Sequence, residues 1–435
     1  MQLIRANIAH FPTATKQPEQ DISIILDGGL VIDNGSIVAV APFNEVNASF
    51  PQASIVDHSG KWLVPGFIDS HLHYPQTQSI ASYGEQLLSW LENYTFPTER
   101  LFSETAHASD IAQVFLRQLL KNGTTTGFVF SSVHKTCCDA LFTAANEINM
   151  AIVAGKVCMD RNCPEDLQDC ADSAQRDSAD LIEKWHNKGR NRYAITPRFA
   201  PTSTEAQMAS LGELACQYPD VFIQTHLSEN LDEIAWVKSL YPNAKSYLDV
   251  YDTYNMVRPR AVFGHGIHLH EEEWQRLHDT GATLAFCPTS NLFLGSGLFD
   301  REMAKQQDVH VALATDVGAG TSFSMLKTYG DAYKVSQLRH APINPYDGFY
   351  LMTQGAAVAH KWENEIGNLN PQSAADFVIL DPHFDELTSL RIKPDAPFDD
   401  VFFALSILGD DRAVSETWVN GHCRYNKKEL THAMV

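Results

Sequence analysis

Five histidine and aspartate side chains stand at or near the ends of apolar, β-like segments of this chain. They are His71 and His73 in FIDSHLH, His226 in FIQTHLSE, His265 in VFGHG and Asp316 in LATDVG. Imidazoles combined with a carboxylate are the ligands that a borderline cation such as Zn²⁺ accepts. Because His71 and His73 are two positions apart on a strand, their rings project to the same side and can chelate one ion. The pattern predicts a metal-dependent hydrolase.

A single histidine at a strand end is more often a hydrogen-bonded structural residue than a ligand. Several such strand ends in one chain are hard to explain by chance. Neutral imidazoles at His71, His73 and His226, with the carboxylate of Asp316, would leave one coordination position open for water. A catalytic Zn²⁺ lowers the pKa of such a water to roughly 7. Zn²⁺ is the expected ion, but the same ligands also accept Fe²⁺, Mn²⁺ or Co²⁺.

Glu229 follows His226 by three residues, where the chain leaves the apolar segment for the next loop. Its carboxyl group is a candidate proton shuttle between the activated water and the substrate. The alternative is an acidic residue at the start of the helix expected over NLDEIAWVKSL, where negative charge stabilises the helix N-terminus. Beside a metal cluster, the shuttle is the preferred interpretation.

These side chains need a fold that brings distant strand ends together. From Val64 onward, apolar β-branched runs alternate with amphipathic segments, and eight such β–α units predict a closed parallel (β/α)8 barrel, the TIM barrel. Active sites of that architecture lie where the carboxyl ends of the strands converge. The expected strands are 64–73, 124–130, 151–157, 193–199, 221–227, 261–267, 282–288 and 309–316. Expected helices include 108–122, 138–149, 179–188, 205–218, 230–240 and 271–280.

The two terminal regions of the chain have a different sequence pattern from the β–α region. Residues 21–64 read as short strands joined by the turn signals Asp27-Gly28-Gly29 and Asn34-Gly35, and strand-like segments return at 376–384, 401–407 and 415–425. We expect these segments to pair into a small β-sandwich beside the barrel. The predicted division is 1–65 and 366–435 for the two halves of the sandwich and 66–365 for the barrel.

One connection, from Tyr74 to about Ser103, is unusually long for a barrel loop. Long connections at the carboxyl end of a barrel are usually functional, so this one is expected to be a lid over the site or a subunit contact.

Composition excludes several classes of partner. A net charge of −21 and a pI near 5.2 would repel nucleic acid and anionic lipid. The N-terminal MQLIRANIAHFP lacks the features of a signal peptide, and no run reaches 18 apolar residues, so a cytoplasmic protein is expected. The eight cysteines contain no Cys-x-x-Cys and are predicted to be reduced structural thiols, with the role of Cys287 left open.

The motifs PGFIDSHLHYPQ, ITPRFAPT, THLSEN, GHGIHL, CPTSN and TDVGAG occur in the order and spacing of the amidohydrolase superfamily. Over nearly its whole length the chain resembles the guanine deaminase family, in the ATZ/TRZ-like branch of that superfamily. The marks of that family are Gln76 in HYPQ, the stretch LLSWLENYTFPTER, and Arg198-Phe199 in TPRF. The end of the fourth strand lacks the bridging lysine that binuclear branches of the superfamily place there, which favours a single metal ion.

The resemblance implies a role for each of these residues. The metal ligands would be His71, His73, His226 and Asp316; the catalytic groups Glu229, His265 and Asp316; and the substrate-binding residues Gln76, Arg198, Phe199, His226, Glu229 and His265. Glutamine can donate and accept at the N1–H/O6 edge of guanine, arginine can donate to O6, and phenylalanine offers an apolar face to the purine. Taken singly, Gln76, Arg198 and Phe199 would more often be a surface residue, an ion-pair partner and a core residue.

The implied reaction is the hydrolytic deamination of guanine to xanthine and ammonia, a step of purine catabolism or salvage. Hydroxide attacks C2, Glu229 protonates N3, and Asp316 accepts or orients the second proton of the water. The resemblance also implies a homodimer. Two alternatives stay open: an aminohydrolase for another amino-heterocycle, such as a pterin, a triazine or an adenosine-like base, and a non-catalytic scaffold on the same barrel. The complete ligand set opposes the scaffold.

Overall fold

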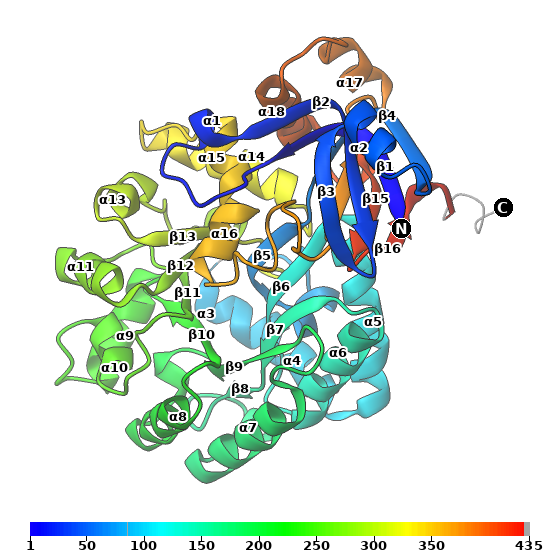
Figure 1. Cartoon of the computed structure of the whole chain (residues 1–435). Helices are drawn as coiled ribbons and strands as arrows, with labels where there is room; N and C mark the ends of the chain where they lie inside the picture. Colours follow the sequence, from blue (N-terminus) through cyan, green and yellow to red (C-terminus); the bar gives the residue numbers. More distant parts are fainter. Residues whose placement is uncertain (85, 430–435) are drawn as a thin grey trace.

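A parallel eight-stranded barrel forms the body of the molecule, in a computed structural model that describes residues 1–84 and 86–429. Its hydrogen-bonded strand order is β5-β6-β7-β9-β10-β11-β12-β13, which follows the sequence and confirms the predicted (β/α)8 barrel (Figure 1). A short additional strand, β8 (Val157–Cys158), pairs with β9. The barrel strands are β5 (Phe67–His73), β6 (Thr124–Phe130), β7 (Ala151–Gly155), β9 (Arg192–Pro197), β10 (Phe222–Leu227), β11 (Ala261–His265), β12 (Thr283–Phe286) and β13 (His310–Leu313).

The ring closes between β5 and the segment that follows β13. The backbone N–H of Asp316 donates to the carbonyl of His71 at 2.8 Å, and that of His73 donates to the carbonyl of Val317 at 2.5 Å. The buried carboxylate of Asp69 strengthens this seam, because it accepts from the backbone N–H of Thr315 at 3.0 Å and from the Thr315 hydroxyl at 2.5 Å. The first and last strands are therefore joined at the predicted ligands.

Apolar side chains fill both faces of the barrel strands. Inside the ring, Ile68, Phe128, Val153 and Val262 belong to one buried cluster, and a larger cluster lies between the strands and the surrounding helices. Strands that are buried on both faces need continuous apolar runs instead of alternation, which is the pattern of these segments.

The predicted helices are present, with one boundary moved. Helix α7 begins at Ala171, eight residues before the expected start at 179, because its first turns (ADSAQRDS) bury only the small side chains of Ala174 and Ser178, so they carry no clear apolar periodicity. The helices around the barrel are α5 (Thr105–Lys121), α6 (Lys135–Glu147), α7 (Ala171–Trp185), α8 (Glu205–Gln217), α9 (Leu231–Leu240), α10 (Tyr247–Asp252), α11 (Glu271–Thr280), α12 (Pro288–Phe293), α13 (Arg301–Gln306), α14 (Met325–Leu338), α15 (Pro345–Leu351) and α16 (Gln354–Ala359).

The long connection after β5 consists mostly of short helical turns. It contains buried aromatic anchors, Tyr74, Trp90, Phe96 and Phe102, and these fix it against the barrel. Its elements are η1 (Tyr74–Gln78), α3 (Leu87–Trp90), η2 (Leu91–Thr95), α4 (Phe96–Glu99) and η3 (Arg100–Ser103).

Both ends of the chain meet in one mixed sheet of seven strands, ordered β16-β15-β14-β4-β1-β2-β3. Antiparallel pairing of β4 with β14, from Pro65 opposite Phe377 to Trp62 opposite Leu380, confirms that the terminal segments pair, and Figure 1 shows the strands from both ends of the chain gathered in one region. We keep the division at 65/66 and 365/366 as a proposal. The strands are β1 (Gln2–His10), β2 (Ser23–Asp33), β3 (Ser36–Pro42), β4 (Ser54–Pro65), β14 (Phe377–Leu380), β15 (Val414–Val419) and β16 (His422–Asn426), with short helices α1 (Pro18–Asp21) and α2 (Phe43–Ser49) between them.

The prediction of a strand at 401–407 is wrong. These residues lie in helix α18 (Phe398–Leu408), which follows the short helix α17 (Glu386–Arg391). The run is so apolar that it shows no clear period, and a buried helix then cannot be told from a buried strand. In the helix, Phe398, Val401, Phe402 and Leu405 all face the core, at helical spacing.

Two expectations from composition can be compared with the structure. Among residues 1–84 and 86–429, no helix combines the length and the apolar character needed to cross a membrane. The eight cysteines all lie within these residues, and none of them forms a disulfide.

Candidate active site

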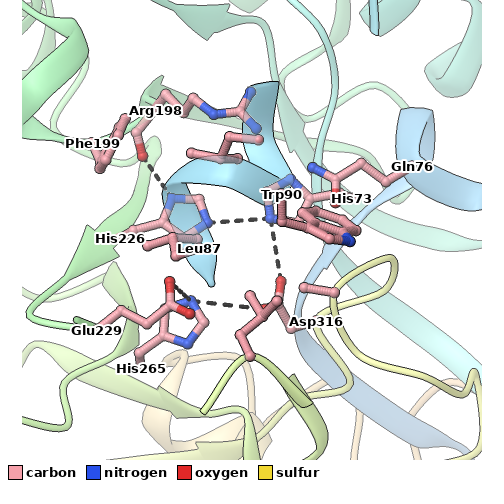
Figure 2. A pocket seen from close by; sticks show the side chains of 13 residues that line it. His73, Gln76, Leu87, Trp90, Arg198, Phe199, His226, Glu229, His265 and Asp316 are labelled. Carbon is pink, nitrogen blue, oxygen red and sulfur yellow. Dashed lines mark hydrogen bonds and ion pairs between the residues drawn. The ribbon is translucent and has the colours of Figure 1, made fainter. Parts of the chain in front are cut away.

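The predicted ligands converge at the carboxyl ends of the barrel strands. Nε2 of His71 and Nε2 of His73 each lie 3.3 Å from Oδ1 of Asp316, and Nε2 of His226 lies 3.2 Å from Nε2 of His73. Nε2 of His265 approaches the other oxygen, Oδ2 of Asp316, at 3.7 Å. Side chains from β5, β10 and β11 and from the end of β13 thus surround one point (Figure 2).

The backbone is specialised where it presents these side chains. His265 and Asp316 have φ angles of 71° and 51°, in the left-handed region that residues other than glycine rarely adopt. Such conformations cost free energy and cluster at functional sites. Beside them, Gly264 leaves room for the imidazole of His71, since a Cβ at this position would lie 2.8 Å from the His71 ring.

Hydrogen bonds from outside the cluster orient two of the rings. Nδ1 of His226 lies 2.6 Å from the carbonyl oxygen of Arg198, and Nδ1 of His265 lies 2.8 Å from Oδ1 of Asn291. Since a carbonyl oxygen can only accept, each Nδ1 carries the proton. Each Nε2 therefore keeps a free lone pair pointing into the site, as in a metal-binding histidine.

Burial keeps the ligands in the ionisation states that a cation needs. It lowers the pKa of His73 to about 4 and that of His226 well below its usual value, so both imidazoles are neutral. Burial alone would raise the pKa of Asp316, but its contacts with His71 and His73 outweigh burial and hold that pKa well below the usual range. The site thus combines neutral imidazoles with one carboxylate.

The residues fit a divalent metal ion. Nε2 of His71 and Nε2 of His265 are buried and make no hydrogen bond, which is costly unless another partner satisfies them. One donor atom from each of His71, His226, His265 and Asp316 lies within 4.8 Å of all the others. This group contains His265 in addition to three of the predicted ligands, while the fourth, His73, contacts His226 and Asp316 directly. Five side chains are thus available to a cation.

Glu229 lies beside this cluster. One carboxyl oxygen lies 3.3 Å from Nε2 of His265, and the other accepts a hydrogen bond from the Ser296 hydroxyl at 2.9 Å. Burial, with the nearby charge of Asp316, raises the pKa of Glu229 to about 8. A carboxyl group with a pKa near neutrality can both accept and release a proton. The structure therefore favours the shuttle over a first-turn acid, because helix α9 begins after this residue, at Leu231.

A cavity opens above the cluster, and the cluster side chains His73, His226, His265 and Asp316 form part of its lining. Gln76, Arg198 and Phe199 all line it together with His226, Glu229 and His265, so the structure brings the six predicted substrate-binding residues to one cavity (Figure 2). Its remaining walls are apolar side chains: Leu87, Trp90, Leu91, Leu294 and Ala319. Such a chamber suits a flat, partly apolar ligand with a polar edge.

A comparison of the sequence with models of protein families agrees with this geometry. The model described as the amidohydrolase family matches residues 62–423, which is most of the chain. The chain belongs to the amidohydrolase family.

Individual relatives within the amidohydrolases are similar to the chain over almost its whole length. The guanine deaminase of Escherichia coli (strain K12) is 46% identical, with 98% of both chains covered. The solved structure of E. coli guanine deaminase superposes with a TM-score of 0.96 at 45% identity, covering 98% of this chain and all of that one. A guanine deaminase structure from C. acetobutylicum with bound guanine in the active site gives a TM-score of 0.88 at 28% identity, covering 98% and 100%.

Four polar residues of this amidohydrolase site did not emerge from the sequence. They are Asp69, Glu99, Asn291 and Ser296, each of which contacts a predicted site residue or the barrel seam. Asp69 lies in FIDSHLH and Asn291 in CPTSN, so the motifs contained them without indicating a role. Glu99 likewise lies in the stretch LLSWLENYTFPTER, which indicated no role for it, while Ser296 carried no recognisable signal. Cys287 is buried, outside the residues that line the cavity, and its thiol donates to the carbonyl of Ala285.

Proposed function

We propose that this amidohydrolase catalyses the hydrolytic deamination of guanine to xanthine and ammonia. The observation that carries the proposal is the single cavity that joins a cation-binding cluster, a protonatable Glu229 and three side chains suited to guanine. The similarity to the guanine deaminase of Escherichia coli, at 46% identity, supports the same substrate.

Three side chains bind and orient the purine in this proposal. The Arg198 guanidinium donates to the O6 carbonyl, and the Gln76 amide pairs with the N1–H/O6 edge. Phe199, with Leu87, Trp90 and Leu91 across the cavity, provides apolar walls for the ring faces and excludes water from them. This arrangement directs C2 of guanine toward the cluster. His226, Glu229 and His265 form the floor beneath it.

The proton transfers fall to Glu229, His265 and Asp316. When bound by the cluster, a divalent cation would lower the pKa of a water molecule to near neutrality. Glu229 takes a proton from the attacking water and delivers it to N3 of the ring, as C2 becomes tetrahedral. His265 and Asp316, 3.7 Å apart, orient the water, and its second proton passes by way of Asp316 to the exocyclic amino nitrogen, so that the C2–N bond breaks with release of ammonia while C2 becomes a carbonyl.

We assign His71, His73, His226 and Asp316 as the ligands of one ion, most simply Zn²⁺, with Fe²⁺ as the alternative. The buried Lys156 does not line the cavity, because its ammonium group is paired with Asp169 at 2.5 Å. That pairing supports a mononuclear site without a bridging lysine. The homodimer stays a prediction.

The test is ammonia release from guanine by the purified, metal-analysed protein, beside adenine, cytosine, a pterin and a triazine, with a chelator-treated control. Release from guanine in proportion to bound metal is expected. Release from another heterocycle alone would refute the guanine assignment but keep the hydrolytic site, and no release from a fully metallated protein would favour the scaffold.

A further inference from the structure

A fully buried carboxylate lies behind two of the guanine-binding side chains. Glu99, the last residue of α4, has no exposed surface. Its Oε1 accepts a hydrogen bond from Nε2 of Gln76 at 3.2 Å, and its Oε2 accepts from Nη1 of Arg198 at 2.7 Å. One carboxylate therefore holds together two residues that are far apart in the sequence and adjacent in the cavity wall.

The contact with Glu99 decides which way the Gln76 amide points. A carboxylate can only accept, so the NH₂ group of Gln76 faces it. The amide oxygen of Gln76 then accepts from the backbone N–H of Gly318 at 3.3 Å. Rotating the amide by half a turn would place its oxygen next to the Glu99 carboxylate and its NH₂ group next to the Gly318 N–H, and neither pair could form a hydrogen bond. Glu99 and Gly318 together fix the amide in one orientation.

Arg198 is restrained in the same way. Its side chain is 2% exposed, so its charge requires a partner, and the ion pair with Glu99 supplies one. The guanidinium carbon also lies 5.4 Å from the centre of the Phe96 ring, three residues before Glu99 on α4. Helix α4 thus contacts the guanidinium through both a charge and an aromatic face.

We propose that Glu99 is a positioning residue that sets the donor and acceptor pattern of the guanine site. It lies outside the residues that line the cavity and acts through Arg198 and Gln76. The inference rests on the proposed function, because it concerns how the O6/N1 edge of guanine is recognised. It also explains why the connection after β5 is long, since α3 and η2 line the cavity while α4 holds its polar wall.

Substitution of Glu99 by glutamine tests this role. The neutral amide has one accepting oxygen and one donating NH₂ group, so it cannot accept from both Arg198 and Gln76 as the carboxylate does. Outer-shell residues that orient metal ligands typically contribute roughly 10–100-fold to activity, and we take the same range for Glu99, which orients substrate-binding side chains in the same way. We expect Glu99→Gln to raise KM for guanine by that factor. The effect on kcat is expected to be smaller, because the O6/N1 edge does not react, and metal content should stay normal.

Two companion variants separate positioning from simple loss of stability. Glu99→Asp keeps the charge on a side chain one methylene shorter and should give a KM between those of the unmodified protein and Glu99→Gln. The matched control is Asp376→Asn, since Asp376 is also a buried carboxylate that bridges an arginine, Arg190, and a second donor, the backbone N–H of Asn420. It should lower Tm without changing KM.

A double variant identifies the route of the effect. If Glu99 acts mainly through Arg198, Glu99→Gln should cost much less in an Arg198→Ala background than alone. An unchanged KM in folded, metallated Glu99→Gln, or a loss that adds in full to that of Arg198→Ala and also to that of Gln76→Ala, overturns the proposal. Should Glu99→Gln fail to fold, Glu99→Asp decides: a raised KM supports the role and an unchanged KM refutes it. Absence of guanine turnover in the unmodified protein would instead refute the proposed function.

Discussion

The replacement of Glu229 by glutamine tests the chemistry of the site most directly. The two side chains have nearly the same shape, and the glutamine can keep both contacts of the glutamate. Its carbonyl oxygen can accept from the Ser296 hydroxyl, at 2.9 Å in the native site, and its NH₂ group can donate to Nε2 of His265, at 3.3 Å. The variant should therefore fold and bind metal normally, while an amide cannot carry the proton.

The expected loss follows from the contribution of proton transfer, roughly 10²–10⁴-fold in rate. At about 1.4 kcal/mol per tenfold change, this is about 3–5 kcal/mol of transition-state stabilisation. Since the lost interaction is made in the transition state, kcat and kcat/KM should fall together. The assay is the conversion of guanine to xanthine, followed with ammonia release and metal content on the same sample.

Glu233→Gln is the matched control. Glu233 is a second buried carboxylate close to the same loop, but it accepts from the backbone N–H groups of Glu229 and Asn230 and from the Tyr247 hydroxyl instead of facing the cluster. Its replacement should reduce stability more than kcat. Near-normal turnover in metallated Glu229→Gln would remove Glu229 from the mechanism. A parallel loss of metal and activity would make it a residue that assembles the site.

Three further outcomes are expected. Chelation should abolish turnover and lower Tm, and Zn²⁺ should restore both, since an ion at 1,000 times its Kd adds about 4 kcal/mol of stability. Asp69→Ala should cost roughly 1–3 kcal/mol in denaturant unfolding and weaken metal retention, because both donors of Thr315 lose their acceptor. Burial lowers the pKa of His10 from 6.5 to about 4. Between pH 6.5 and pH 4 the unfolded chain therefore binds more protons than the folded protein, and the free energy of unfolding falls by up to about 3 kcal/mol as the pH drops through this range. His10→Gln should therefore show a smaller decrease in Tm between pH 7 and pH 5; an equal decrease in both proteins would exclude His10 as the cause.

The sequence predicts those site residues that lie at the ends of strands. His71, His226 and Asp316 each stand at or just beyond the end of a long apolar run, and the rule that strand ends converge in a barrel then brings them together. The fold follows from the same runs, since eight alternating units leave few other arrangements. The pairing of the two terminal segments could also be predicted, because turn signals in these segments mark short antiparallel strands.

What the sequence does not predict depends on contacts without a local pattern. Glu99 is 23 residues from Gln76 and 99 residues from Arg198, and it lies in a run of short helical turns that no hydrophobic period describes. Ser296 reaches Glu229 across 67 residues from a glycine-rich loop. The helix at 398–408 resembles a strand in sequence because its apolar residues, including the exposed Ile407, form an almost continuous run without a clear helical period. In each case tertiary packing, not local propensity, sets the outcome.

The seam between β5 and the end of β13 has a consequence for the order in which the molecule is made. Asp69 and Thr315, which close it, are 246 residues apart, and the same two segments carry His71, His73 and Asp316. A growing polypeptide has no complete set of the proposed ligands until the eighth strand has been synthesised and has docked against the first. Contacts between such distant segments form late, because the intervening chain must be ordered first. The cation can therefore be bound fully only after the barrel has closed, and a truncated or partly folded chain cannot retain it.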